Sequence, residues 1–400
     1  MDPVIFPYVW KRPFAVSSRF VVLRELELRH FRNLGVQELH FPPEGVAVIG
    51  DNAQGKTNLL EAIYYLESFR SFRGAGDGEL AAFSEDVFYL RGSVEGDRPA
   101  RVSAGYDRKR KKKKVSVDGT DAVRIAGALG RLGAVVFSPS DVELVSGGPR
   151  ARRRFLDILL SLNRKGYVEA LAGYRKALAQ RNAALKANAG AAAVVAWDRG
   201  LVEQGARVTH LRHEWATTWS SPFATYCTAI SGCDPVAMTY RPNLGNARGG
   251  SRAGAEAFGA DEGLVRERFE VRLAETRETD AQRGVTTVGP HRDELHLTIS
   301  SQGRSLPART FGSGGQRRTA ALALRLAEAA TIRRERGTEP ILLLDDAFAE
   351  LDEGRSRQVM ELLAGEGAGQ VVLTAPKESD ARLRGPSLER WRIREGVVEA

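Results

Sequence analysis

The chain has 400 residues, of which 42% are hydrophobic and 27% are charged, and its formal net charge is +9. A chain of this length and composition can bury a large core, which excludes a single small module and wholesale disorder. The positive charge favours an anionic partner such as nucleic acid, although a composition rich in arginine gives the same balance without one.

Cysteine usage and the distribution of apolar residues indicate a cytoplasmic protein. Only Cys227 and Cys233 are present, too few for a disulfide framework or a four-cysteine zinc site. No apolar run approaches the length of a membrane span, and prolines and charges interrupt the first 20 residues, where a signal peptide would need an apolar core. We therefore expect a cytoplasmic location, no membrane partner and a loose extension at residues 1–20.

The folded part of the chain opens with β-prone segments. FVVLRELELRHF, GVQELHF and GVAVIG predict strands, and the segment NLLEAIYYLESF then carries apolar residues at helical spacing. Residues 87–125 alternate short β-prone runs with Gly and Asp, which is typical of an antiparallel meander. A strand, a glycine-rich loop and a helix follow one another in the order that a phosphate-binding loop requires.

The glycine-rich loop fits the pattern G-x-x-x-x-G-K-[ST] without a gap. It consists of Gly50, Asp51, Asn52, Ala53, Gln54, Gly55, Lys56 and Thr57. Its backbone N–H groups and the N-terminus of the next helix can surround a phosphate. We expect Lys56 to reach the β- and γ-phosphates of ATP, Thr57 to hold Mg²⁺, and Asn58 to line the nucleotide. The alternative is a glycine-rich turn that ends in Lys-Thr by chance.

A run of seven cations lies between two β-prone segments, where we expect a hairpin turn. It consists of Arg108, Lys109, Arg110, Lys111, Lys112, Lys113 and Lys114. Such a run attracts the phosphate backbone of DNA without reading its sequence, and no interleaved aromatic residues indicate base stacking. A solvated charged turn is the alternative. Arg150 and Arg152–Arg154 form a second cluster, for which DNA contact and packing between lobes are equally open.

The character of the sequence changes at about residue 148. Residues 148–286 contain long Ala-, Leu- and Arg-rich segments and predict an inserted α-helical lobe, or arm, between two parts of a discontinuous head at residues 21–147 and 287–400. His291 and Arg292 lie in the segment GPHRDEL beyond this insertion. We assign them a structural role, because the six histidines are scattered without metal-ligand spacing.

Two motifs near the end of the chain complete a nucleotide site. Ser313, Gly314, Gly315 and Gln316 precede a helical segment within the region 311–336, near the lobe boundary, and form a second anion cradle or a plain helix cap. The apolar run ILLLDD ends in Asp345 and Asp346. Asp345 is the expected Mg²⁺ ligand and Asp346 the candidate base for water, with a turn cap as the alternative for Asp346. Lys56, Asp345 and Asp346 are thus the predicted catalytic residues.

These motifs resemble those of ABC-type ATPases. Ser-Gly-Gly-Gln before a helix is similar to the ABC signature, and Asp352 stands where that family has its D-loop. The resemblance implies that ATP joins two copies of the chain, with Ser313 of one copy meeting the γ-phosphate on Lys56 of the other. The fold implied is α/β: an ABC-type P-loop ATPase head with an antiparallel β subdomain and an inserted α-helical lobe.

Within the SMC-like branch, the chain resembles the RecF family most closely. The segments that carry this resemblance include LRHFRNL, GDNAQGKTNLLEAIYYLESFRSFR, FSPSDVELVSGGPRARRRFLDI, GPHRDEL and LLLDDAFAELD. The resemblance implies a recombination mediator in DNA repair, replication and the SOS response that forms a homodimer with ATP. Gapped DNA or single-strand to double-strand junctions would be its substrate, and RecR, RecO and RecA its partners. Arg32 and Asn33, in LRHFRNL, are implied to line the nucleotide.

Departures from the ABC pattern qualify the expected activity. Asp346 stands where most ABC ATPases have Glu, and Thr374 stands after VVL with no switch histidine. The shorter acid predicts slow ATP hydrolysis, and the resemblance implies that this hydrolysis is stimulated by DNA and serves as a dimerisation switch. Two other functions remain open, an ABC transporter ATPase subunit and an ATP-independent SMC-like DNA scaffold.

Overall fold

The computed structural model describes residues 19–96, 99–232, 236–244, 261–301, 303–346, 353–365, 369–384 and 388–400. The contacts within it divide the chain into two units, Met1–Asp141 with Glu328–Ala400, and Val142–Ala327. Residues 287–327, which we expected in the head, fall in the second unit by this division. The reason is visible in the β pairing, because Glu294–Ser301 pairs antiparallel with Ala237–Arg241 of the inserted part.

A six-stranded sheet forms one layer of the first unit. Its strands, in spatial order, are β16 (Val397–Glu399), β15 (Glu389–Arg394), β3 (Gly45–Ile49), β14 (Val371–Ala375), β13 (Ile341–Asp345) and β8 (Ala134–Phe137). All neighbours are parallel except β15 and β16. Both β13 and β14 are buried along their whole length, as strands covered on two faces are. The ends of β3, β14 and β13 therefore meet at one edge.

A mainly antiparallel sheet, whose first two strands pair parallel, forms the second layer of this unit. Its strands are β12 (Thr338–Glu339), β1 (Arg19–Arg29), β4 (Val87–Gly96), β5 (Ala100–Asp107), β6 (Lys112–Val117) and β7 (Thr120–Asp121), with β2 (Gln37–His40) paired to β1. The meander expected at residues 87–125 is β4 to β7. Helix α1 (Lys56–Ser68) shares one hydrophobic core with strands of both sheets, which fixes the helix that follows the phosphate loop.

The remaining helices of the first unit are α12 (Glu353–Gly365) and α13 (Glu378–Arg384), with 3-10 turns at Asp77–Glu79, Ile125–Gly127 and Pro139–Val142. No helix within the described residues is both long and apolar enough to cross a membrane.

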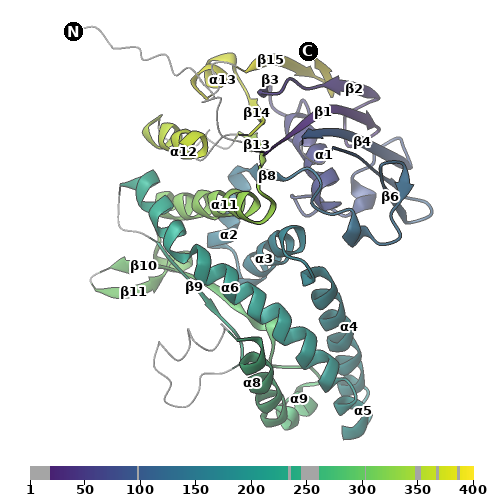
Figure 1. Ribbon diagram of the computed structural model, residues 1–400, viewed down its shortest axis with the longest axis vertical. Helices are drawn as coiled ribbons and strands as arrows, with labels where there is room; N and C mark the ends of the chain where they lie inside the picture. The colour runs from purple at the N-terminus through teal and green to yellow at the C-terminus, as the bar shows by residue number, and fades with distance from the viewer. Residues whose placement is uncertain are drawn as a thin grey trace. The chain divides into compact units, whose positions relative to one another are not determined.

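The second unit is mainly helical. Figure 1 shows α4 (Tyr167–Lys186) and α6 (Asp198–Ser231) running side by side. Its other elements are α2 (Glu143–Ser146), α3 (Pro149–Asn163), α5 (Ala191–Val195), β9 (Ala237–Arg241), α8 (Glu262–Glu275), α9 (Arg277–Arg283), a 3-10 turn at Pro290–Arg292, β10 (Glu294–Ser301), β11 (Arg304–Pro307) and α10 (Ala308–Phe311). Helix α11 (Gly314–Arg336) crosses the division between the units. The α/β fold with an antiparallel β subdomain and a helical lobe is thus confirmed.

Candidate nucleotide site

The glycine-rich loop connects the end of β3 to the start of α1. Gly55 has φ +114, and a Cβ atom there would lie 2.9 Å from Asn33 Oδ1. Only glycine therefore fits this position without strain. Within the described residues, no side chain caps the N-terminus of α1 and no acid lies in its first turn. The positive end of the helix thus remains open to an anion.

The Lys56 side chain folds over the loop that precedes it. Its Nζ donates to the carbonyl oxygens of Gly50 at 2.7 Å and Asp51 at 3.0 Å. The side chain is buried, with 5% of the residue exposed. Carbonyl groups have no formal charge and do not neutralise the ammonium, so its positive charge is available to an anionic ligand in the loop.

Asp345, at the end of the Walker B strand β13, has its carboxylate directly against the phosphate loop. Thr57 Oγ1 donates to Asp345 Oδ1 at 2.8 Å. Burial raises the pKa of Asp345, the Asp346 charge adds to the shift, and hydrogen bonds from Thr57 and Thr374 oppose it. A divalent cation would relieve this cost of burying a charge.

The oxygen donors present fit Mg²⁺. A hydroxyl and a carboxylate are the hard ligands that Mg²⁺ takes together with water and substrate phosphates. No group of three or more His, Cys, Asp or Glu side chains among the described residues could hold a metal ion by itself. The site therefore suits a metal ion that arrives with a nucleotide, which would supply further oxygen ligands.

The backbone turns sharply after the Walker B strand. Asp346 has φ +44, a left-handed conformation that is uncommon outside glycine. Its N–H donates to Thr374 Oγ1 at 3.0 Å. The two acids are thus held at the carboxyl end of β13, next to the phosphate loop. Asp352, the expected D-loop residue, lies outside the described residues.

Asn33 and Asn58 lie at the phosphate loop, whereas Arg32 pairs with the helix that follows the loop. Asn33 Nδ2 donates to the Gln54 carbonyl at 3.2 Å and accepts at Oδ1 from Asn58 Nδ2 at 2.7 Å. Arg32 forms a bidentate pair with Glu61 at 2.9 and 3.1 Å. Sequence reasoning missed Glu61, although an acid on the apolar side of α1 was a usable signal. Its buried carboxylate fixes the direction of the Arg32 guanidinium.

The β15–β16 hairpin contacts the phosphate loop through hydrogen bonds to Gln54. The Glu395 N–H donates to Gln54 Oε1 at 2.5 Å, and the Gly396 N–H donates to the Gln54 carbonyl at 2.9 Å. Gly396 has φ +80, and a Cβ atom there would lie 1.9 Å from the Asn33 carbonyl oxygen. The turn between β15 and β16 thus determines where Gln54 lies. No local sequence signal pairs these distant positions.

The signature residues lie in the second unit, at the start of α11. The Gln316 N–H donates to Ser313 Oγ at 3.1 Å, and the Ser313 N–H donates to Gln316 Oε1 at 2.8 Å. This is a reciprocal capping box, so Ser313 does cap its helix. The hydroxyl proton of Ser313 takes no part in these two bonds. Ser313 and Gly314 are exposed, and the cap therefore leaves Ser313 able to donate to a ligand.

The seven cations lie in the turn of the β5–β6 hairpin and at the start of β6, and they differ in their contacts. Arg108 donates to the carbonyls of Gly78 at 2.9 Å and Ala81 at 3.0 Å, and thereby holds a neighbouring loop. Lys113 pairs with Asp77 at 2.8 Å and lies over the Tyr65 ring, and burial lowers its pKa. Both are tied into the fold. The exposed members are Lys109, Arg110, Lys111, Lys112 and Lys114.

Carboxylates accompany three of the exposed cations. These ion pairs are Lys109 with Asp86, Arg110 with Asp107 and Lys114 with Asp121. Exposed pairs of this kind contribute little to stability and can exchange for phosphate contacts. Lys111 and Lys112 lie at the turn itself and at the start of β6. Both the charged-turn and the DNA interpretations of the hairpin are compatible with this arrangement.

Two of the four arginines at the start of the arm, Arg152 and Arg153, are used in packing, whereas Arg150 and Arg154 are exposed. Arg152 forms a bidentate pair with Glu294 at 2.8 and 3.1 Å and is buried. Arg153 donates to the Asp293 carbonyl at 2.8 Å. Both arginines therefore hold α3 against the start of β10, inside the second unit.

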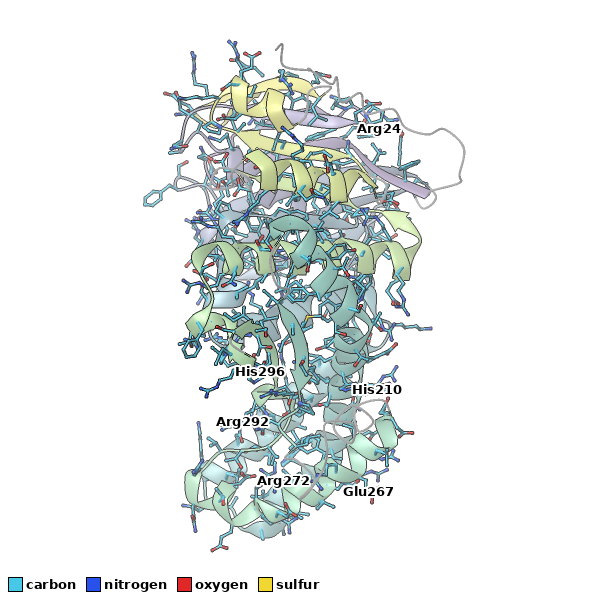
Figure 2. All side chains as sticks on the ribbon, turned by 90° about the vertical axis from the view of Figure 1, so that its left-hand side faces the viewer. Arg24, His210, Glu267, Arg272, Arg292 and His296 are labelled. Carbon is cyan, nitrogen blue, oxygen red and sulfur yellow. The ribbon has the colours of Figure 1, made fainter. Side chains whose placement is uncertain are left out.

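The segment GPHRDEL is likewise part of the packing of the second unit. His291 Nδ1 bonds to the Tyr174 hydroxyl at 2.5 Å and Nε2 to the Thr286 carbonyl at 3.1 Å. Burial lowers the pKa of His291 to about 4, so the ring is neutral at pH 7. Arg292, labelled in Figure 2, donates to the same carbonyl at 3.3 Å. These contacts agree with the structural role expected for both residues.

The chain is similar to known proteins over most of its length. The family model of the RecF/RecN/SMC N-terminal domain matches residues 22–382. The DNA replication and repair protein RecF of Caldanaerobacter subterraneus subsp. tengcongensis is 35% identical over 365 residues, covering 90% of this chain and 95% of the relative. A structure of the recombination mediator protein RecF with ATP in the RecFOR pathway has 32% identity and a TM-score of 0.83, covering 97% of this chain and 99% of that chain.

A more distant structure shows the fold alone. This SMC head, bound to the C-winged helix domain of ScpA, is 13% identical, with a TM-score of 0.52 and coverage of 94% of this chain and 96% of that chain. Together with the family model and the RecF structure, this likeness confirms the expected fold class.

The hairpin behind the loop gives a test of the site. Gly396→Ala should weaken ATP binding at least about tenfold, because the new Cβ atom displaces the turn that holds Gln54. Gly119→Ala is the matched control, since Gly119 lies in the β6–β7 turn with φ +79 and its Cβ would meet nothing within 4 Å. Titration with a fluorescent ATP analogue measures both variants. Equal affinities would show that the hairpin does not position the loop.

Proposed function

Because the chain belongs to the RecF family, we propose that it is an ATP-dependent DNA-binding recombination mediator of DNA replication and repair. The observation that carries the ATP-dependent part is the hydrogen bond from Thr57 to Asp345 beside the buried Lys56. A cation, a hydroxyl and a carboxylate in this arrangement support the proposal that the site binds a nucleoside triphosphate with Mg²⁺. The family relationship argues against an ABC transporter ATPase subunit, and the nucleotide site argues against an ATP-independent scaffold.

The residues of this site would have separate roles in ATP hydrolysis. The backbone of Gly50 to Gly55 and the Lys56 ammonium would bind the phosphates, while Thr57 and Asp345 would hold Mg²⁺. The metal ion, when bound, neutralises charge on the β- and γ-phosphates. Asp346 would orient the attacking water and accept its proton. Its short side chain supports a slow reaction, suited to a switch, which DNA would accelerate.

ATP would be bound by two copies of the chain at once and would hold them together as a dimer. Ser313 is exposed at a helix start with a hydroxyl proton that its cap does not use. Facing the γ-phosphate on a second copy, it would complete that copy's site together with Gly314, Gly315 and Gln316. A ligand shared by two chains stabilises their dimer by its own binding free energy, and hydrolysis would release it.

The proposed substrate is gapped DNA or a junction of single and double strands. Solved relatives are described as recombination mediators in the RecFOR pathway. By the family relationship, RecR would be the direct partner, with RecO and RecA acting beyond it in the cytoplasm. The exposed cations of the β5–β6 hairpin would contact the phosphate backbone, which requires no base reading.

Mixing two variants tests the shared nucleotide site. Lys56→Ala and Ser313→Ala should each remain monomeric with ATP in light scattering, whereas the wild-type mass doubles. A mixture of the two variants should regain dimers and part of the ATP turnover, because a mixed dimer has one site with both Lys56 and Ser313 intact. A mixture that stays monomeric and inactive, or a wild-type chain whose mass never changes with ATP, would contradict a nucleotide site shared between two chains.

The hairpin is tested by its exposed cations alone. Lys111→Ala/Lys112→Ala should weaken binding to gapped DNA and reduce the slope of log affinity against log salt by about 2, since each phosphate contact contributes about 0.9. ATP binding should not change. Arg266→Ala/Arg283→Ala removes two exposed cations from the arm and serves as the charge-matched control. If both double variants give the same salt slope, the hairpin does not contact DNA.

A further inference from the structure

Thr374 lies at the centre of the strand edge where the nucleotide site is built. It is fully buried in β14, with Asp345 of β13 as its neighbour on one side and Val48 of β3 on the other. The phosphate loop follows β3 and the acidic pair ends β13. Thr374 therefore lies between the two halves of the site, where a polar side chain requires hydrogen-bond partners.

The Thr374 hydroxyl contacts both acids of the site. It accepts from the Asp346 N–H at 3.0 Å, and its single proton is directed to Asp345 Oδ1 at 3.2 Å and the Leu344 carbonyl at 3.3 Å. A hydroxyl offers one donor and two acceptor positions, so these contacts match its capacity. One side chain thus reaches the backbone of Asp346 and the carboxylate of Asp345.

The first of these contacts determines how the chain leaves β13. Asp346 has φ +44, a conformation that turns its N–H out of the regular strand ladder. Thr374 Oγ1 accepts this N–H and so stabilises the turn. The direction in which the Asp346 carboxylate leaves the backbone depends on that turn, and therefore on Thr374.

The second contact fixes the carboxylate of Asp345. Its Oδ1 accepts hydrogen bonds from both Thr57 and Thr374. If Thr57 and Asp345 held Mg²⁺, the Thr374 hydroxyl would still donate to the same carboxylate oxygen. Its proton would then help to fix the orientation of the Asp345 carboxylate, in the way that outer hydrogen bonds orient metal ligands elsewhere.

We propose that Thr374 is a positioning residue for Mg²⁺-dependent ATP hydrolysis, which orients Asp345 through its hydroxyl proton and Asp346 through its lone pair. The inference rests on the proposed ATPase function. It assigns a task to Thr374, which stands where ABC ATPases have their switch histidine, and it requires no contact between Thr374 and the nucleotide.

Two substitutions separate the hydroxyl from the shape of the side chain. Thr374→Val removes the hydroxyl at nearly constant volume, and Thr374→Ser retains it. In the valine variant, ATP affinity without Mg²⁺ should stay within about twofold, and the gain in affinity on adding Mg²⁺ should shrink about fivefold. The kcat should fall at least about tenfold, and KM for ATP with Mg²⁺ should rise about fivefold, because slow hydrolysis makes KM follow the affinity. The serine variant should recover kcat to within about threefold of wild type.

A buried threonine elsewhere provides the matched control. Thr209 in α6 is fully buried, and its hydroxyl has no hydrogen-bond partner among the described residues. Thr209→Val should leave the Mg²⁺ gain and kcat unchanged. Circular dichroism and Mg²⁺-free ATP affinity report folding. If the valine variant does not fold, Thr374→Ala replaces it, which removes the hydroxyl together with the γ-methyl group and is compared with Thr374→Ser.

A double-mutant cycle with Asp346→Ala separates positioning from general damage. If Thr374 acts through Asp346, Thr374→Val should lower kcat by less than about twofold in the Asp346→Ala background. Equal losses in both backgrounds, or an unchanged Mg²⁺ gain in the valine variant, would overturn the proposal. A wild-type chain without turnover would refute the ATPase function instead, and the Mg²⁺ gain would still decide whether Thr374 orients Asp345.

Discussion

The hydrogen bond from Thr57 to Asp345 joins side chains that are 288 positions apart in the sequence. It forms because β3, β14 and β13 are adjacent parallel strands whose carboxyl ends meet at one edge of the sheet. The phosphate loop leaves the first of these strands and the acidic pair ends the third. Everything else in the site depends on this register, since a slip of one residue would turn each strand's side chains to the opposite face.

The supports around this edge share a common feature, which is that each satisfies a backbone group. Asn33 and the Gly396 N–H donate to the Gln54 carbonyl, and Thr374 accepts from the Asp346 N–H. The loop and the turn adopt left-handed conformations at Ala53, Gly55 and Asp346. Such conformations persist where surrounding contacts determine them, as they do here. The site is thus held in shape before a nucleotide enters.

The phosphate loop and the Walker B strand could be predicted from sequence because each is a local pattern in a strand-loop-helix or buried-strand context. The bracing of Gln54 by Glu395 could not, since nothing in the residues between them records that contact. The sequence does not distinguish the seven cations at residues 108–114 from one another. In the structure, Arg108 and Lys113 bond to neighbouring parts of the fold. The expected boundary at residue 287 also shifted, because the pairing of β10 with β9 is a long-range event.

Measuring the affinity of a non-hydrolysable ATP analogue at several protein concentrations tests most directly whether the nucleotide is shared between two copies of the chain. If Lys56 of one copy and Ser313 of another hold the same γ-phosphate, binding and dimerisation are linked, and the apparent Kd should fall as protein concentration rises. Ser313→Ala should abolish this dependence. A wild-type Kd that is the same at every protein concentration would contradict the account.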